Sequence, residues 1–173
     1  MRTKFSPLTF LVALSILGLA DVVRAEVRLA RIFADHMVLQ RDASVPIWGF
    51  AEKGEKVTVS FAGQTQRATA DAAGRWSVSL DPLSANAKGQ TLVARGSNET
   101  VIRDALVGEV WYVSGQSNMG FSVRAMAKSL NAGKKLIETA DDPLLRYRKV
   151  NEKESATLQA DLPDRLPWAI CNS

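Results

Sequence analysis

The apolar pattern of this chain changes near residue 105, and this change constrains the fold more than any other feature. Upstream, apolar and polar residues alternate from Val57 to Phe61, the period-two pattern of a strand with one buried face. From Ala105 to Val113 two nearly continuous apolar runs are interrupted only by Gly108-Glu109. A strand without alternation is covered on both faces, as in a parallel α/β sheet. We therefore expect two domains in succession.

The first domain is expected to consist of short strands. After the strand at Val57–Phe61, Thr65–Ala70 has the composition of a second strand, and Asp71-Ala72-Ala73-Gly74 that of a turn. Trp76, Val78 and Leu80 then form the apolar face of a returning strand. Short strands separated by closely spaced turns predict an antiparallel β-sandwich over residues 26–105.

The second domain is expected to begin with a buried strand at Val110–Val113. The elements expected after it are a polar turn, two helices, a strand and a loop, at residues 114–118, 121–130, 131–137, 144–150 and 151–167. A parallel strand is stable only when neighbouring strands pair with it and helices cover both faces. Residues 106–173 are too few and too irregular for that, so we expect only the N-terminal fragment of an α/β domain and a mixed, truncated fold.

Residues 1–25 form a separate segment with the pattern of a secretory signal peptide. Arg2 and Lys4 precede a mostly apolar stretch from Leu8 to Ala20, and small residues lead to a cleavage site after Ala25. The apolar stretch is shorter than the roughly 18 to 20 residues that a spanning helix needs. We expect export to a secreted or periplasmic location, with no membrane association after cleavage.

Composition excludes several kinds of chemistry. Cys171 is the single cysteine, so an internal disulfide is impossible, and thiolate metal sites have too few ligands. We therefore expect neither a metal nor another cofactor. An exported chain without disulfides fits a bacterial envelope better than a small disulfide-stapled scaffold. The net charge is +4, but no Lys/Arg cluster is interleaved with aromatic residues, which speaks against nucleic acid as a partner. The sequence carries no signal for an oligomeric state.

The polar turn after Val113 contains a candidate nucleophile, Ser117. A turn between a strand end and a helix exposes a hydroxyl at the sheet edge and directs free backbone N–H groups toward developing negative charge. A catalytic serine also needs a base and oxyanion donors. The run Gly115-Gln116-Ser117-Asn118-Met119 lacks the last glycine of the G-x-S-x-G nucleophile elbow. From the residues alone, Ser117 is either a nucleophile or an ordinary turn residue.

The same run, Gly115-Gln116-Ser117-Asn118-Met119, led by Val107–Trp111, resembles the first sequence block of the sialate O-acetylesterases, a branch of the SGNH hydrolase superfamily. Four upstream stretches are similar to that family's N-terminal β-sandwich: Phe33–Arg41, Val45–Gly49, Gly54–Val59 and Gly74–Trp76. The resemblance covers the chain from about Val27 to its C-terminus. It implies that the second domain has the flavodoxin-like three-layer α/β fold of SGNH hydrolases.

The resemblance also implies an activity and a set of site residues. Ser117 matches a nucleophile that attacks an acetyl ester on sialic acid or a related sugar, and its backbone N–H would be one oxyanion donor. Gln116 and Asn118 are candidates for oxyanion or substrate contacts. The family's catalytic histidine and its orienting acid come from a later block that these residues do not include. We therefore expect the chain alone to be an inactive truncation. Gly120 departs from the family's acidic residue at that position.

Three alternatives stay open. His36 could serve as the base, but it lies 81 residues before Ser117 in the other expected domain, so a histidine satisfied by hydrogen bonds in the sandwich is the favoured interpretation. The chain could instead be a non-catalytic β-sandwich module that binds a glycan or a partner. It could also belong to an acetylesterase of plant polysaccharide. Trp48, Trp76 and Trp111 lie in strand-like runs and are expected in a core rather than stacked on sugar.

Overall fold

The computed structural model describes residues 26–116, 122, 127, 135, 137–150 and 155–171. The expected signal peptide, Ser117, Asn118 and nearly all of the helix expected at 121–130 lie outside these residues. Within them strands dominate, and Lys135, Ile137 and Glu138 are the helical residues. No helix in this part of the chain has the length and apolar character to cross a membrane.

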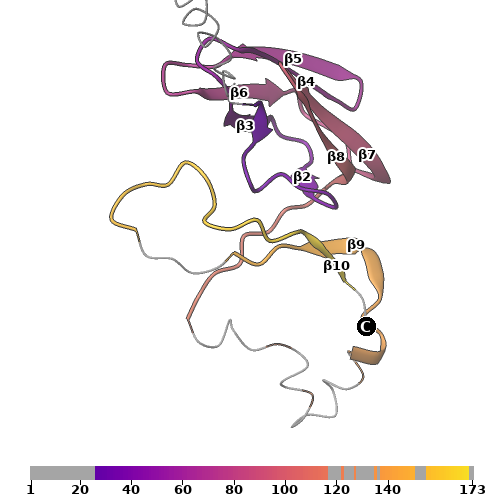
Figure 1. Ribbon diagram of the computed structural model, residues 1–173. Coiled ribbons are helices and arrows are strands. Elements are labelled where there is room, and N and C mark those ends of the chain that lie inside the picture. Colours follow the sequence, from indigo (N-terminus) through magenta and orange to yellow (C-terminus); the bar gives the residue numbers. More distant parts are fainter. Residues whose placement is uncertain are drawn as a thin grey trace, which may run out of the picture.

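The strands form three sheets (Figure 1). Their bounds are β1 Arg28–Leu29, β2 Val38–Gln40, β3 Val45–Phe50, β4 Lys56–Phe61, β5 Gln64–Thr69, β6 Arg75–Leu80, β7 Asn86–Arg95, β8 Glu99–Gly108, β9 Asp142–Tyr147 and β10 Ala169–Cys171. The orders are β1-β3-β6, β2-β8-β7-β4-β5 and β10-β9. The neighbouring strands pair antiparallel, except β2 with β8, which are parallel.

The sheets β1-β3-β6 and β2-β8-β7-β4-β5, together called the two-sheet unit, share one hydrophobic core. The alternation predicted for Val57 to Phe61 is confirmed, because the apolar residues of β4 are buried and Thr58 and Ser60 are half-buried. Trp76, Val78 and Leu80 of β6 enter the same core from the other sheet. Each such side chain stabilises the fold by roughly 1.5–3 kcal/mol relative to leaving it in water.

The turn at Asp71–Gly74 joins the two sheets rather than closing a hairpin. The expected strand at Thr65–Ala70 exists as β5, but β5 pairs with β4, whereas β6 pairs with β3. The hairpin is β4–β5, whose two-residue loop, Ala62-Gly63, has φ of 49° and 79°. Positive φ at both positions defines the type I′ turn that matches strand twist. Alternation shows which face of β6 is buried but not which strand it joins.

The prediction of a buried strand at Val110–Val113 is wrong. β8 ends at Gly108, and the following residues have no regular structure. Trp111 is 82% exposed and Tyr112 90%, so Trp111 is not the core residue that was expected, whereas Trp76 is buried and Trp48 packs against the core. A strand buried on both faces needs paired neighbours, and in the described part of the chain none pairs with this segment. Its apolar side chains therefore stay in solvent.

The C-terminal part forms the β9–β10 ribbon, which lies below β2 and β8 in the view of Figure 1. Arg146 of β9 contacts the two-sheet unit through hydrogen bonds to His36 and Asp104. β9 begins two residues before the strand expected at 144–150, and no regular structure occurs at 155–168, as expected for that loop. Trp168 donates its indole Nε1–H to the carbonyl oxygen of Ile32 at 2.8 Å and packs against the core. The expected three-layer α/β arrangement is not seen among the described residues, where β9 and β10 pair antiparallel.

Candidate functional site

The segment that leads to Ser117 leaves the two-sheet unit at the end of β8. Gly108 is paired with Gln40 of the parallel strand β2, and Arg41 donates its backbone N–H to the Gly108 carbonyl oxygen at 2.9 Å. From Glu109 to Gln116 the residues are exposed. Gln116, one of the predicted site residues, is therefore solvent-accessible. Ser117 and Asn118 lie outside the described residues, so their roles stay predictions.

The first residues of this segment are held by the side chains at the end of β2. Gln40 accepts a hydrogen bond from the backbone N–H of Val110 at 2.9 Å through Oε1 and donates from Nε2 to Glu109 Oε2 at 3.2 Å. Arg41 Nε donates to Glu109 Oε1 at 2.7 Å. The hydrogen bonds from Gln40 and then Arg41 lower the pKa of Glu109. The position of the chain is thus fixed as far as Val110.

This Gln40–Arg41–Glu109 contact is a feature that sequence reasoning missed. Both ends lie in stretches that carry the family resemblance, but Gln40 and Glu109 are 69 residues apart in sequence. Only the parallel pairing of β2 with β8 brings them together. The role that these hydrogen bonds support is positional, because they hold Glu109 and the backbone of Val110 at the end of β2.

His36 is engaged at the junction between the two-sheet unit and β9. Its Nδ1 lies 2.6 Å from Asp104 Oδ2, and its backbone N–H donates to the Arg103 carbonyl oxygen at 3.1 Å. The interpretation of His36 as a histidine satisfied by hydrogen bonds is confirmed. Both His36 and Asp104 have left-handed backbone, with φ of 68° and 56°, a conformation that non-glycine residues adopt uncommonly. The contact between their side chains helps to hold both in place.

Arg146 of β9 completes this cluster. Its Nη1 donates to Asp104 Oδ2 at 2.8 Å and to the His36 carbonyl oxygen at 3.3 Å, and its side chain is only 5% exposed. The hydrogen bond with His36 is the largest cause that lowers the pKa of Asp104, followed by that from Arg146. The carboxylate therefore links three segments. We assign His36 a structural role on these contacts.

Metal ligands do not gather in the part of the chain that the structure describes. No group of three or more His, Cys, Asp or Glu side chains there could hold an ion. Cys171 is half-buried, with its thiol 4.0 Å from the Ala140 carbonyl oxygen.

Comparison with known proteins identifies the relatives of this chain, although no family model matches it. Sialate O-acetylesterase of Mus musculus is 32% identical over 154 residues, which are 82% of this chain and 28% of that protein. Sialate O-acetylesterase of Homo sapiens is 32% identical over 149 residues, 78% of this chain and 26% of the relative.

A solved structure of a related enzyme supports the same relationship. A carbohydrate acetylesterase from Xanthomonas citri superposes with a TM-score of 0.76 and 34% identity, covering 84% of this chain and 32% of that protein. The chain thus spans between a quarter and a third of the length of these relatives. On the strength of the sequence blocks around Ser117, the two-sheet unit and these matches, the chain belongs to the sialate O-acetylesterase family.

Proposed function

We propose that this chain supplies the N-terminal part of a carbohydrate O-acetylesterase that removes acetyl groups from sialic acid or a related sugar. The observation that carries the proposal is the agreement between the sialate O-acetylesterase matches and the acetylesterase structure over about four-fifths of the chain. The proposal includes a β-sandwich formed by the two-sheet unit, since both sheets enclose one core. It also includes an SGNH-type α/β domain after it, and export after loss of residues 1–25.

In the proposed reaction, Ser117 Oγ attacks the carbonyl carbon of the acetyl ester while a base takes its proton. The backbone N–H of Ser117, with Gln116 or Asn118, stabilises the negative oxygen of the tetrahedral intermediate. The bond between the carbonyl carbon and the sugar oxygen then breaks, and that oxygen takes the proton from the base to leave as a hydroxyl. Water next hydrolyses the acyl-enzyme to release acetate and restore the serine. The Gln40 and Glu109 contacts support this role by fixing the start of the serine segment.

The base is the part of the reaction that this chain does not readily provide. Its single histidine, His36, is bound to Asp104 beside β9, and Arg146 shares that carboxylate. A base must reach hydrogen-bond distance of the serine hydroxyl. We therefore propose that the 173-residue chain alone releases acetate from an aryl acetate no faster than background. Turnover that Ser117→Ala abolishes would refute this part of the proposal.

A chimera tests the esterase proposal itself. Residues 26–173 would replace the matched segment of the Xanthomonas citri acetylesterase, and acetate release would be followed with an aryl acetate and with O-acetylated sialic acid. We expect activity that Ser117→Ala lowers about a thousandfold or more. Ser114→Ala is the matched control, since it removes the hydroxyl of an exposed serine three residues earlier in the sequence and is expected to retain activity. A folded chimera whose activity survives Ser117→Ala would contradict the serine assignment.

The same chimera addresses substrate choice. Comparing O-acetylated sialic acid with acetylated xylan distinguishes the sialate assignment from the alternative of an esterase acting on plant polysaccharide. We expect the ratio of kcat/KM values to favour the sialate, because the curated relatives are named for it.

A further inference from the structure

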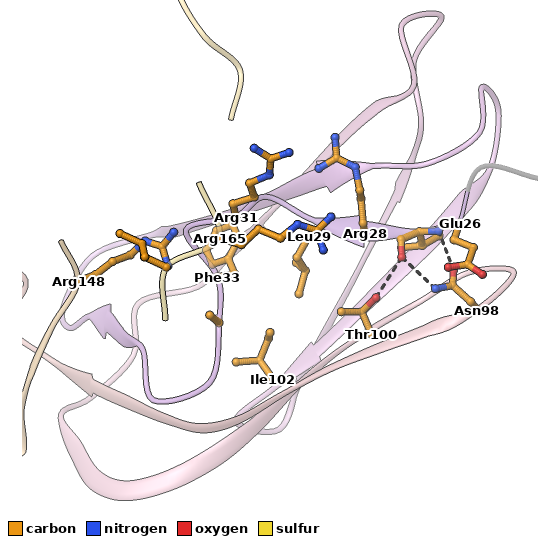
Figure 2. Close-up of a pocket in the computed structure, with 13 residues that line it drawn as sticks. Glu26, Arg28, Leu29, Arg31, Phe33, Asn98, Thr100, Ile102, Arg148 and Arg165 are labelled. Atoms are coloured by element: carbon orange, nitrogen blue, oxygen red, sulfur yellow. Dashed lines mark hydrogen bonds between the residues drawn. The ribbon is translucent and has the colours of Figure 1, made fainter. Parts of the chain in front are cut away.

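A cavity rich in arginine lies where the C-terminal part of the chain meets β1. Its volume is about 780 Å³, within the range of small-molecule sites. Figure 2 shows Arg28 and Arg31 from the region of β1, together with Arg148 and Arg165 from the C-terminal part, around the same space. Four cationic side chains from distant parts of the sequence thus line one cavity.

Two of these arginines already have an anionic partner. Asp161 Oδ2 accepts from Arg28 Nη1 at 2.9 Å, and Asp161 Oδ1 accepts from the backbone N–H of Arg31 at 2.7 Å. Arg31 Nη1 also donates to the Leu162 carbonyl oxygen at 2.8 Å. These contacts fasten the C-terminal part to β1, so Arg28 and Arg31 form a fixed wall of the cavity.

Arg148 is buried without enough acceptors. Its side chain is 2% exposed, and its nearest acceptors are two oxygens of Asp164, each 3.4 Å from Nη2. Its Nε and Nη1 are buried and have no hydrogen-bond partner in the described part of the chain. Burial lowers the pKa of Arg148, with Asp164 and Asp161 opposing it. Because arginine stays protonated in proteins, its unpaired donors favour an additional acceptor.

Arg165 and the apolar walls complete the cavity. Arg165 is exposed and makes no hydrogen bond or ion pair with the described residues. Leu29, Phe33 and Ile102 are buried side chains of the lining, and Leu166 is half-buried. The cavity therefore combines the buried, unpaired donors of Arg148 and the exposed guanidinium of Arg165 with an apolar surface that could contact the body of a ligand.

We propose that this cavity binds the oxyanion of a small organic molecule, with Arg148 as the buried anchor and Arg165 as the second cationic contact. Carboxylate, sulfate and phosphate share the chemistry, since a guanidinium presents donors in a planar fork that matches their oxygens. The apolar walls favour an organic acid over a bare inorganic ion. The site stands on these described contacts alone and does not depend on the role of Ser117.

The binding test uses the full chain and a pair of ligands that differ at one group. Glucuronate carries a carboxylate where glucose carries a hydroxymethyl group, so their comparison isolates the anion. At fixed ionic strength, we expect glucuronate to raise the midpoint of thermal unfolding with increasing concentration and glucose to leave it unchanged. A sulfate titration identifies the source: a weaker effect than glucuronate supports an organic acid, and an equal effect supports a free inorganic anion.

Substitutions of the cavity arginines test whether glucuronate binds in this cavity. We expect Arg148→Met and Arg165→Gln each to weaken glucuronate binding about tenfold or more, as loss of a charge-assisted hydrogen bond does. Arg67→Gln, an exposed arginine of β5 outside the cavity lining, is the matched control and should bind as the wild type does. Without ligand, Arg148→Met should unfold at a lower temperature, because it leaves the largely buried Asp164 carboxylate without this ion-pair partner.

Three results would overturn the proposal. They are equal effects of glucuronate and glucose, glucuronate binding unchanged in Arg165→Gln and in a folded Arg148→Met, and equal weakening by Arg67→Gln. The first would also be the result if a carboxylate of the chain itself satisfied Arg148. If Arg148→Met does not fold, Arg165→Gln alone decides the outcome.

Discussion

Replacing Asp104 by asparagine isolates the charge at the junction between the two-sheet unit and β9. Asparagine tolerates the left-handed backbone at this position and keeps an acceptor oxygen, so the substitution changes little except the negative charge. That charge accepts hydrogen bonds from His36 at 2.6 Å and from the nearly buried Arg146 at 2.8 Å. The variant therefore leaves Arg146 without its counter-charge.

The expected loss can be estimated from these two contacts. A hydrogen bond to a charged group contributes about 1.5–3 kcal/mol, but the Asp104 side chain is 35% exposed, so solvent screens both interactions. With one acceptor retained, we expect a loss of about 2 kcal/mol in the free energy of unfolding, measured by urea denaturation at pH 7. In a chain of this length that corresponds to a fall of roughly 4–8 °C in Tm.

The matched control is Asp42→Asn. Asp42 also has left-handed backbone, with φ of 55°, but its side chain is 66% exposed and contacts Arg41 at the surface. We expect it to cost less than about 0.5 kcal/mol. If Asp104→Asn destabilises the protein no more than Asp42→Asn does, the linking role assigned to the Asp104 carboxylate is refuted.

The pH dependence provides a second check. Because the folded protein lowers the pKa of Asp104 below its ordinary value of 3.8, the stabilisation is complete above that value and is lost as pH falls through the lower folded pKa. Once the pH falls below about 4, the difference in stability between wild type and Asp104→Asn should thus shrink. A difference that grew as the pH fell from about 4 would contradict the assigned direction.

Three further predictions follow from individual contacts. Gly49→Ala places a Cβ against the backbone carbonyl oxygen of Arg28, so it should destabilise the fold by about 3 kcal/mol or more in urea. Gly54→Ala meets open space and should cost only about 1 kcal/mol for its positive φ, so equal losses would contradict this explanation. Gln40→Leu removes the acceptor of the Val110 N–H, so hydrogen exchange of that amide should accelerate, and unchanged protection would argue against the anchor. Asp161→Ala should speed proteolysis within residues 155–168, and resistance equal to wild type would show that other contacts hold this segment.

The local elements of the fold were predictable because they depend on neighbouring residues. Alternation at Val57–Phe61 and at Trp76–Leu80 marked two half-buried strands, and the structure has both. Their pairing was not predictable. A period of two fixes the buried face of β6, but β3 and β5 are both suitable partners, and packing of the shared core decides between them.

The exposure of Val110–Val113 was likewise not predictable from the local sequence. A continuous apolar run indicates a strand buried on both faces only if other strands and helices cover it. In the described structure nothing of that kind covers the segment, and Trp111 is exposed. The run is apolar, as its sequence shows, but its burial depends on neighbouring strands and helices that a local pattern cannot identify.

For the candidate site, sequence blocks around Ser117 were sufficient to identify the family, because the order of small polar residues after an apolar run is local information. The hydrogen-bonded state of His36 was predicted, but its partners were not. Asp104 and Arg146 lie 68 and 110 residues away in sequence, and neither carries a local signal that points to His36.

By itself the sequence determined the half-buried strands at Val57–Phe61 and Trp76–Leu80 and the family. Tertiary structure alone decided which segments meet: β2 beside β8, β9 against His36, and four arginines around one cavity. The physical reason is that hydrophobic periodicity acts over a few residues. Hydrogen bonds and ion pairs between distant side chains form only after the core has fixed the positions of the strands that carry them.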